Sequence, residues 1–287
     1  PAEKLVTETP DTEKLKVFAA MTAQYYAPIR RPSFFSRPGK LVDMVHSGQY
    51  GAIIALNEKR DIAGGILLCF RTEKIVQIFG PYCFLKEQQR AVDEALLDAC
   101  IHRIARTKAL GLFSLRGLPE TLSNHFERLG TLRFSQAGQP PVSEASFYRL
   151  LHEDPGFEVC SAAALKDYLE RQYHQLALAR IIKTSRDMGE TRSGASLFSA
   201  EIHRDQASVT LRPLLAGNDY AENIERHLRF LRDDHFVNIH VELDMGIPWH
   251  ADMIDALLAS RFRPGFLLPF TGKADLMILQ YDDETES

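Results

Sequence analysis

Few residues of this 287-residue chain have the types and spacing that catalysis requires. His240 and Glu242 fall on one face of an alternating stretch, which is the spacing that a base and its orienting partner could use. A half-exposed strand produces such pairs routinely, so a structural role is the simpler interpretation. Five histidines without HxxxH or HExxH spacing argue against a metal site: His203, His227, His235, His240 and His250. Three serines without a G-x-S-x-G context argue against a hydrolase: Ser114, Ser123 and Ser143.

A basic and aromatic cluster lies in residues 27–40, APIRRPSFFSRPGK, where three prolines indicate a loop. The side chains of interest are Arg30, Arg31, Phe34, Phe35 and Arg37. Guanidinium groups could bind an acidic acceptor or a phosphate. The alternative is a solvated flank whose aromatic side chains cover a sheet. A formal net charge of −4 gives no support to a nucleic-acid partner.

Composition places the chain among ordinary globular proteins, with 45% hydrophobic and 25% charged residues. Its four cysteines show no CxxC spacing, and we expect them to be reduced. No apolar run approaches the ~18 residues that a membrane-spanning helix needs, and residues 1–4 (PAEK) lack the apolar stretch of a signal peptide. We therefore expect a cytoplasmic protein without a membrane partner.

The elements that would position these residues alternate between strands and helices. In residues 1–150 the patterns predict a strand, then a helix with Thr9 as N-cap that ends near Tyr25, then a helix at 41–46. An antiparallel meander follows at 52–56, 62–70 and 74–84, and the clearest helix covers 87–108. A strand at 112–115, a helix at 120–129 and a strand at 131–134 complete an α/β mixture.

The second half repeats the end of this order. A strand at 236–243, a helix at 252–260 and strands at 266–270 and 275–281 follow a helix at 224–231 and a polar loop at 183–196. Gly117-Leu118-Pro119 and Gly246-Ile247-Pro248 occupy matching places after a strand. Internal duplication is the simplest explanation, and it predicts two modules at 1–150 and 151–287.

The element order resembles the fold of the GNAT family, the acetyl-CoA-dependent N-acetyltransferases. The local similarities are Thr9-Pro10-Asp11, the meander, the long helix after it, and Phe126-Glu127-Arg128-Leu129-Gly130. In the second half, Ile247-Pro248 and two segments that run from Phe266 to Pro269 and from Asp275 to Tyr281 resemble tandem members. The resemblance implies an α/β fold with mixed sheets and two tandem GNAT-like acyl-CoA N-acyltransferase modules.

The resemblance also implies a cofactor loop, patterned R/Q-x-x-G-x-G/A, whose backbone N–H groups face the pyrophosphate of coenzyme A. The matching residues are Gln88, Gln89, Arg90, Ala91, Val92 and Asp93, and they are joined by Cys83 and Phe84 on the preceding strand. Gln88 fits the pattern, but Ala91 and Asp93 replace small residues, and an Asp93 carboxylate would repel the anion. Arg90 could compensate, or residues 88–93 could simply form a solvated first turn.

The family's acid for the departing thiolate is usually a tyrosine where this chain has Phe126, so Tyr82 or Tyr148 would have to substitute. We take Tyr82 as the catalytic candidate and a strand N–H near Tyr82 and Cys83 as the oxyanion donor. The second module lacks a glycine loop, and Asn218-Asp219 begins its helix, so we expect any functional pocket in the first module. Acyl transfer from acetyl-CoA or another acyl-CoA to an amine of a small molecule or a protein is the leading function. The alternative is a catalytically inactive scaffold that binds a ligand or a protein. The sequence leaves open whether the protein forms a homodimer.

Overall fold

The computed structural model describes residues 4–184 and 192–283. The chain divides into two compact units. Unit 1 comprises Pro1–Arg128 and Glu144–Glu153, and unit 2 comprises Leu129–Ser143 and Asp154–Ser287. Among the described residues, no helix combines the length and apolarity that crossing a membrane requires. The loop predicted at 183–196 lies partly outside these residues.

A mixed sheet with the strand order β1-β2-β3-β4-β5-β7-β6 organises the first half of the chain. Its strands are β1 (Val6–Glu8), β2 (Gly51–Leu56), β3 (Ile62–Thr72), β4 (Ile75–Cys83), β5 (Gly111–Ser114), β6 (Glu127–Gln136) and β7 (Gln139–Leu150). The predicted antiparallel meander is confirmed as β2, β3 and β4. β5 then pairs with β4 in parallel and with β7 in antiparallel orientation. Nearly all of β6 and the start of β7 belong to unit 2.

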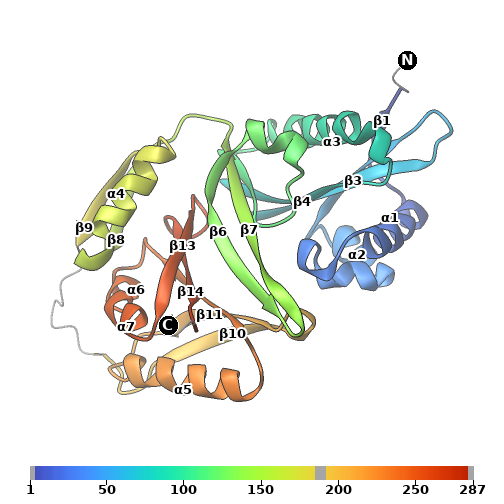
Figure 1. The fold of residues 1–287 in the computed structure, drawn as a ribbon. Helices are drawn as coiled ribbons and strands as arrows, with labels where there is room; N and C mark the ends of the chain where they lie inside the picture. The colour runs from blue at the N-terminus through green and yellow to red at the C-terminus, as the bar shows by residue number, and fades with distance from the viewer. Residues whose placement is uncertain (1–3, 185–191, 284–287) are drawn as a thin grey trace. The chain divides into compact units, whose positions relative to one another are not determined.

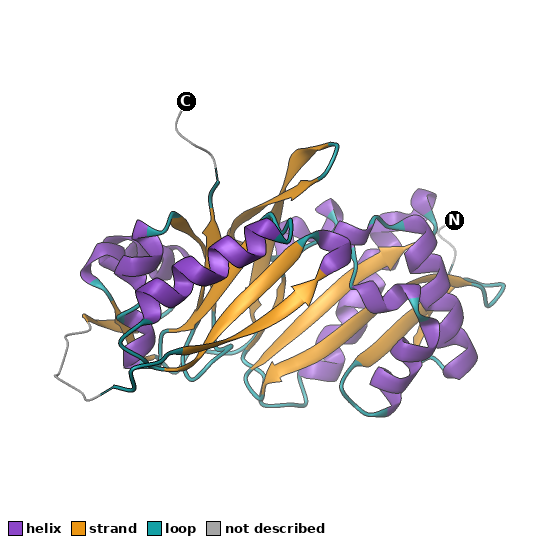
Figure 2. Cartoon of the chain, turned by 90° about the horizontal axis from the view of Figure 1, so that it is seen from below, coloured by secondary structure: helices purple, strands orange, loops and turns teal. Residues whose placement is uncertain are grey.

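Helices cover both faces of the unit 1 sheet (Figures 1 and 2). On one face lie α1 (Thr12–Tyr25) and α2 (Pro38–His46), and on the other lies α3 (Gln89–Ile104). The inner side of α3 presents Val92, Leu96 and Cys100, which recur at four-residue spacing and are buried. On the opposite face, the ring of Phe18 packs directly against Gly65, where a Cβ would come within 2.5 Å of it. That contact explains the glycine in the middle of β3.

Unit 2 contains a second mixed sheet with the order β10-β11-β12-β14-β13. The elements of unit 2 are β8 (Phe157–Ser161), α4 (Lys166–Gln175), β9 (Arg180–Thr184), β10 (Leu197–His203), β11 (Ser208–Leu215), α5 (Tyr220–Asp233), β12 (Asn238–Asp244), α6 (Pro248–Ala251), α7 (Ile254–Ala259), β13 (Phe262–Leu268) and β14 (Leu276–Tyr281). β8 and β9 form a separate parallel pair.

The pseudo-repeat is confirmed by the pairing of the two sheets. The order β10-β11-β12-β14-β13 repeats β3-β4-β5-β7-β6, and the successive pairs have the same directions: antiparallel, parallel, antiparallel. A helix, α3 or α5, connects the parallel strands in each case. Gly117-Leu118-Pro119 follows β5 and Gly246-Ile247-Pro248 follows β12, at the matching turns that the sequence predicts.

The prediction of a helix at 120–129 is wrong. Glu120–His125 form a 3₁₀ helix, and β6 begins at Glu127. Gly130 does not end a helix; it lets two backbones approach, because a Cβ there would lie 2.5 Å from the carbonyl oxygen of Gly265. β7 was not predicted from the sequence.

Three smaller expectations differ from the structure. Asp11, not Thr9, caps α1, and its carboxylate accepts a hydrogen bond from the N–H of Lys14 at 2.9 Å. The helix predicted at 252–260 is confirmed only as α7, and a separate short helix, α6, precedes it. β12 is central in its sheet, so His240 is buried rather than half-exposed.

Candidate functional site

The candidate site begins where β4 and β5 separate in unit 1. The two strands pair over only three positions, from Ile75 opposite Gly111 to Gln77 opposite Phe113. β4 continues to Cys83, whereas β5 ends at Ser114. Strands that separate leave backbone N–H and C=O groups that must find other partners.

Tyr26, which follows α1, supplies those partners at the end of β4. The N–H of Cys83 donates to the Tyr26 hydroxyl at 2.8 Å, and this hydroxyl donates to the carbonyl oxygen of Cys83 at 3.0 Å. Burial raises the pKa of Tyr26 to about 12, so the hydroxyl is neutral. One neutral hydroxyl thus satisfies the N–H that the sequence analysis chose as oxyanion donor.

The structure places the catalytic candidate Tyr82 in the hydrophobic core. Its side chain is 1% exposed and packs between the rings of Phe35 and Tyr26, with centroids 5.3 and 4.9 Å away. Its hydroxyl donates to the carbonyl oxygen of Arg30 at 3.3 Å, and burial strongly raises its pKa. Tyr82 therefore contributes chiefly to packing in this structure.

The proposed cofactor loop leads from β4 into α3. Phe84 is buried against Phe18 at 6.2 Å between ring centroids, so it belongs to the core. Gln88 and Gln89 stand at the start of α3, whose first turn carries no acidic residue. The guanidinium of Arg90 points to Glu94, 2.8 Å away, and Ala91 is exposed.

Val92 and Asp93 face the interior of unit 1, so residues 88–93 are not a uniformly solvated turn. Asp93 is fully buried, and its Oδ2 accepts a hydrogen bond from the Thr121 hydroxyl at 2.7 Å. Burial raises the pKa of this carboxyl from 3.8 to about 6. The carboxylate thus turns away from the exposed end of α3, where the sequence analysis expected it to repel an anion.

The loop of residues 27–40 divides between core and surface. Phe34 and Phe35 are buried and stack on each other at 5.3 Å, so they cover the sheet, as the structural alternative stated. Arg31 binds the loop itself, with Nε donating to the carbonyl oxygen of Tyr26 and Nη1 to Ser36, both at 2.9 Å. Arg37 is exposed.

Arg30 connects the strands that meet at the split. Its carbonyl oxygen accepts from Tyr82 on β4, and the same oxygen lies 3.1 Å from where a Cβ of Gly117, after β5, would stand. Its Nε lies 3.3 Å from Oε1 of Glu144 on β7. The Glu144 side chain is only 8% exposed, so a buried carboxylate stands beside a half-exposed guanidinium.

Sequence reasoning missed Glu144 and Tyr26. Glu144 alternates with Ser146 and Tyr148 on the buried side of β7, and a carboxylate at an inward position of a strand is an available signal. That signal could be used only after β7 had been recognised. Nothing in the local sequence distinguishes Tyr26 from its exposed neighbour Tyr25.

Unit 2 has an equivalent split, and charged groups close it. β11 and β12 pair from Ser208 opposite Asn238 to Leu211 opposite Val241. At the next position, Arg212 donates to both carboxylate oxygens of Glu242, at 2.6 and 3.2 Å. Asp219 stands at the start of α5 and accepts from the N–H of Ser196 at 2.6 Å. Hydrogen bonds from the side chain and from the backbone of Ser196 lower the pKa of Asp219.

His240 and Glu242 do not work as a pair. Nε2 of His240 lies 3.1 Å from the side-chain nitrogen of Gln280, whereas Glu242 binds Arg212. Among the described residues, no group of three or more potential metal ligands gathers.

Comparisons with known proteins concern the fold. Neither a protein-family model nor a curated protein sequence matches the chain. Similar solved structures include a GNAT acetyltransferase from Staphylococcus aureus Mu50 (15% identity, TM-score 0.37, covering 52% of this chain and 99% of that one). A GNAT-superfamily phosphinothricin acetyltransferase from Sinorhizobium meliloti in complex with AcCoA is 16% identical, with a TM-score of 0.41 and coverage of 52% and 89%. A GNAT N-acetyltransferase from Escherichia coli in complex with CoA is 12% identical, with a TM-score of 0.36 and coverage of 52% and 83%.

Proposed function

We propose that this chain is an acyltransferase that moves an acyl group from an acyl-CoA to an amine, and that unit 1 carries the site. The observation that supports this most directly is the split between β4 and β5. Pairing ends at Gln77, so at the far end of β4 the backbone of Cys83 is bound by the Tyr26 hydroxyl, which a ligand could displace, rather than by a strand. The element order that the sequence shares with GNAT proteins makes an acyl-CoA the expected ligand.

The start of α3 suits the pyrophosphate of such a ligand. Helix N-termini attract anions through free N–H groups and the helix dipole. The first turn of α3 holds no acidic side chain, and Asp93 in the next turn is bound to Thr121 in the interior. The 3₁₀ turn just before the helix carries one cation, Lys86, and one carboxylate, Glu87, so it adds no net charge. Ala91 in place of glycine remains a departure from the family pattern.

The chain's own groups would orient the reactants and move one proton. A bound acyl-CoA would supply the acyl group as a thioester. The N–H of Cys83 would donate to the acyl carbonyl oxygen once the Tyr26 hydroxyl moves aside. Glu144 would accept one proton from the ammonium form of the acceptor, and Arg30 would hold that carboxylate in place. The amine nitrogen would then form a bond to the acyl carbon as the carbon–sulfur bond breaks, and the departing thiolate would take the second proton of the amine.

A second candidate is a ligand-binding protein without catalysis. The specific observation in its favour is the position of Tyr26, whose hydroxyl satisfies both backbone groups of Cys83. In that case the Tyr26 hydroxyl permanently occupies the backbone groups at the split, and the chain has a GNAT-like fold but does not catalyse acyl transfer.

Calorimetric titration with acetyl-CoA and with free coenzyme A tests the proposal, with Tyr26→Phe as the key variant. Losing the hydroxyl frees the Cys83 N–H and C=O, so we expect acetyl-CoA to bind a few-fold more tightly. Tyr25→Phe is the matched control, because Tyr25 is 55% exposed and makes no comparable bond to β4. Its affinity should equal that of the wild type.

Release of free thiol from acetyl-CoA, measured with a panel of small amines and lysine peptides, then separates the two candidates. Binding with thiol release that Glu144→Gln abolishes supports the acyltransferase. Binding without release supports the second candidate. No binding by the wild type or by Tyr26→Phe would contradict the placement of a cofactor at the split.

A further inference from the structure

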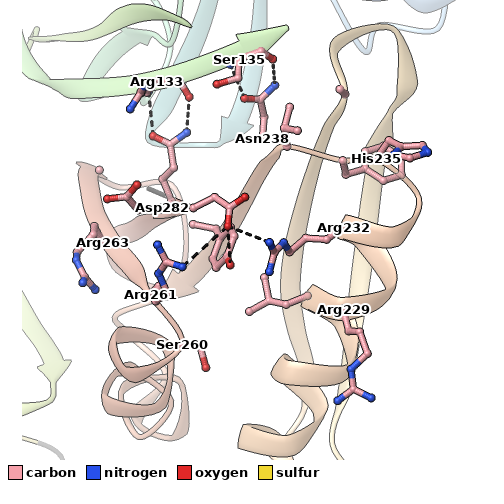
Figure 3. A pocket seen from close by; sticks show the side chains of 18 of the residues that line it. Arg133, Ser135, Arg229, Arg232, His235, Asn238, Ser260, Arg261, Arg263 and Asp282 are labelled. Carbon is pink, nitrogen blue, oxygen red and sulfur yellow. Dashed lines mark hydrogen bonds and ion pairs between the residues drawn. The ribbon is translucent and has the colours of Figure 1, made fainter. Parts of the chain in front are cut away.

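A large pocket lies in unit 2, although the sequence analysis expected a functional pocket only in the first module. It has a volume of about 1380 Å³ and lies among β6, the C-terminal half of α5, β13 and the end of β14 (Figure 3). Its lining holds five arginines (Arg133, Arg229, Arg232, Arg261 and Arg263) and four acidic residues (Glu225, Asp233, Asp282 and Asp283). Pockets that recognise small molecules typically measure roughly 300–1,000 Å³, so this one can hold a ligand much larger than a single ion.

Two of these arginines converge on one carboxylate. Nη2 of Arg232 lies 3.1 Å from Oδ1 of Asp283, and Nη1 of Arg261 lies 4.0 Å from the same oxygen (Figure 3). The Tyr281 hydroxyl donates to that oxygen at 3.4 Å. Arg232 belongs to α5 and Arg261 precedes β13, so donors from separate elements surround a single position. We call Arg232, Arg261 and Tyr281 the carboxylate cradle.

The group that occupies the cradle is weakly held. Asp283 lies beyond the end of β14, outside regular secondary structure, and its side chain is 60% exposed. Arg232 and Arg261 are 51% and 37% exposed. Exposed ion pairs contribute little to stability and exchange readily with ions from solvent. An external anion can therefore take the place of Asp283 without unfolding any element.

We infer that the carboxylate cradle binds an acidic group, a carboxylate or a phosphate, of a small anionic molecule, and that Asp283 occupies it as an internal competitor. Guanidinium groups recognise both kinds of oxyanion through paired N–H donors. Arg229 and Arg263 lie farther out on the two sides of the pocket (Figure 3), where a ligand with a second acidic group would meet them. This site is separate from the acyl-transfer site proposed in unit 1.

Citrate and inorganic pyrophosphate, titrated separately at low ionic strength, test the inference with carboxylate and phosphate probes. The double variant Arg232→Gln/Arg261→Gln should weaken binding at least about tenfold, because both charge-assisted donors are lost. Asp283→Asn should tighten binding about two- to fivefold, because the competitor loses its charge. Asp255→Asn is the matched control: it changes the net charge equally, on the exposed side of α7 and outside the pocket lining.

The probe that binds identifies the acidic group. The inference is overturned if neither probe binds the wild type or Asp283→Asn, or if Asp283→Asn has the same affinity as Asp255→Asn. Arg171→Gln, an exposed arginine on α4, shows how much of any loss is a general charge effect. Acetyl-CoA affinity should be unchanged in the double variant, so failure of this site and failure of the proposed function can be told apart. If the double variant does not fold, the Asp283→Asn and Asp255→Asn comparison still decides.

Discussion

The split between β4 and β5 and the split between β11 and β12 occupy equivalent places in two sheets of the same order, yet different groups close them. In unit 1 a neutral tyrosine hydroxyl binds the backbone of Cys83. In unit 2 Arg212 bridges the strands to Glu242, and its Nη1 also contacts Glu201 at 2.7 Å. A ligand group can replace a hydroxyl at little cost in free energy. Breaking a half-buried ion pair costs more, because it leaves a charge without a partner.

The helix that follows each split differs in the same sense. The first turn of α3 is free of acidic residues, whereas Asp219 begins α5 and Glu222 lies in its first turn. The Asp219 side chain makes no capping hydrogen bond to α5, but its negative charge at the positive end of the helix dipole opposes an anionic ligand. Equivalent topology therefore does not preserve equivalent chemistry, and this difference is the reason why we propose unit 1 as the half that binds a ligand.

The largest effect that we predict concerns the buried carboxyl of unit 1. The pKa of Asp93 is about 6 in the folded protein and 3.8 ordinarily. The folded state thus holds the proton more tightly, so the free energy of unfolding should fall by about 3 kcal/mol as pH rises from about 4 through 6. Asp93→Asn should remove this loss, as urea denaturation at several pH values would show.

Asp98→Asn is the control for Asp93, because Asp98 is exposed on the outer side of α3. Its pH profile should match that of the wild type. Equal profiles for the wild type and Asp93→Asn would show that the Asp93 carboxyl does not titrate in this range.

Next in size is the effect of opening the split in unit 2. Arg212→Met leaves Glu242, which is 14% exposed, without its cation, and should cost about 2 kcal/mol of unfolding free energy. Arg204→Met removes an exposed pair with Asp234 and should cost less than about 0.5 kcal/mol. If Arg212→Met and Arg204→Met lost equal unfolding free energy, the Arg212–Glu242 pair would stabilise no more than an exposed ion pair. The split in unit 2 would then not be closed more firmly than the split in unit 1.

Opening the split in unit 1 should cost less. Tyr26→Phe removes both hydrogen bonds to Cys83 and should lower the unfolding free energy by about 1 kcal/mol. Hydrogen exchange gives a local measurement, since the Cys83 amide should exchange faster in this variant. Unchanged exchange at Cys83 would mean that the hydroxyl does not protect the strand end.

The sequence predicted the architecture better than the site. Strand-like runs identified the meander and helical spacing identified α3, because buried faces impose these patterns locally. The repeated Gly-x-Pro motif identified the duplicated turns. The prediction of a helix at 120–129 failed because Gly130 does not end a helix. Gly130 instead makes a close backbone contact with Gly265, which is far away in the sequence. Contacts between residues so far apart produce no periodic pattern in the local sequence.

The candidate site shows the same limit. Residues 88–93 were found through the resemblance to the GNAT cofactor loop and the arginine loop through its composition, but neither shows which side chains point inward. Asp93 binds Thr121, and Glu144 meets Arg30 across more than a hundred residues. The arginines of the unit 2 pocket are dispersed from β6 to β13, so no window of sequence shows them as a cluster.

The smallest effect separates a binding role of the arginine loop from a structural one. A triple change of Arg30, Arg31 and Arg37 would mix the two roles, because Arg31 holds the carbonyl of Tyr26 and Arg30 faces Glu144. Arg37→Gln alone removes an exposed cation, so the melting temperature should stay unchanged. Acetyl-CoA should bind about two- to threefold more weakly, and added salt should abolish the difference.

Arg31→Gln is the matched variant with the opposite expectation. It loses the bonds to Tyr26 and Ser36 and should lower the melting temperature, because the segment that carries the Tyr26 hydroxyl is then held less firmly. If Arg37→Gln leaves affinity unchanged at low salt while Arg31→Gln alters it, the loop acts on the split only through Tyr26. The basic surface of the loop would then have no part in binding, and the comparison of the two splits would rest on the hydroxyl alone.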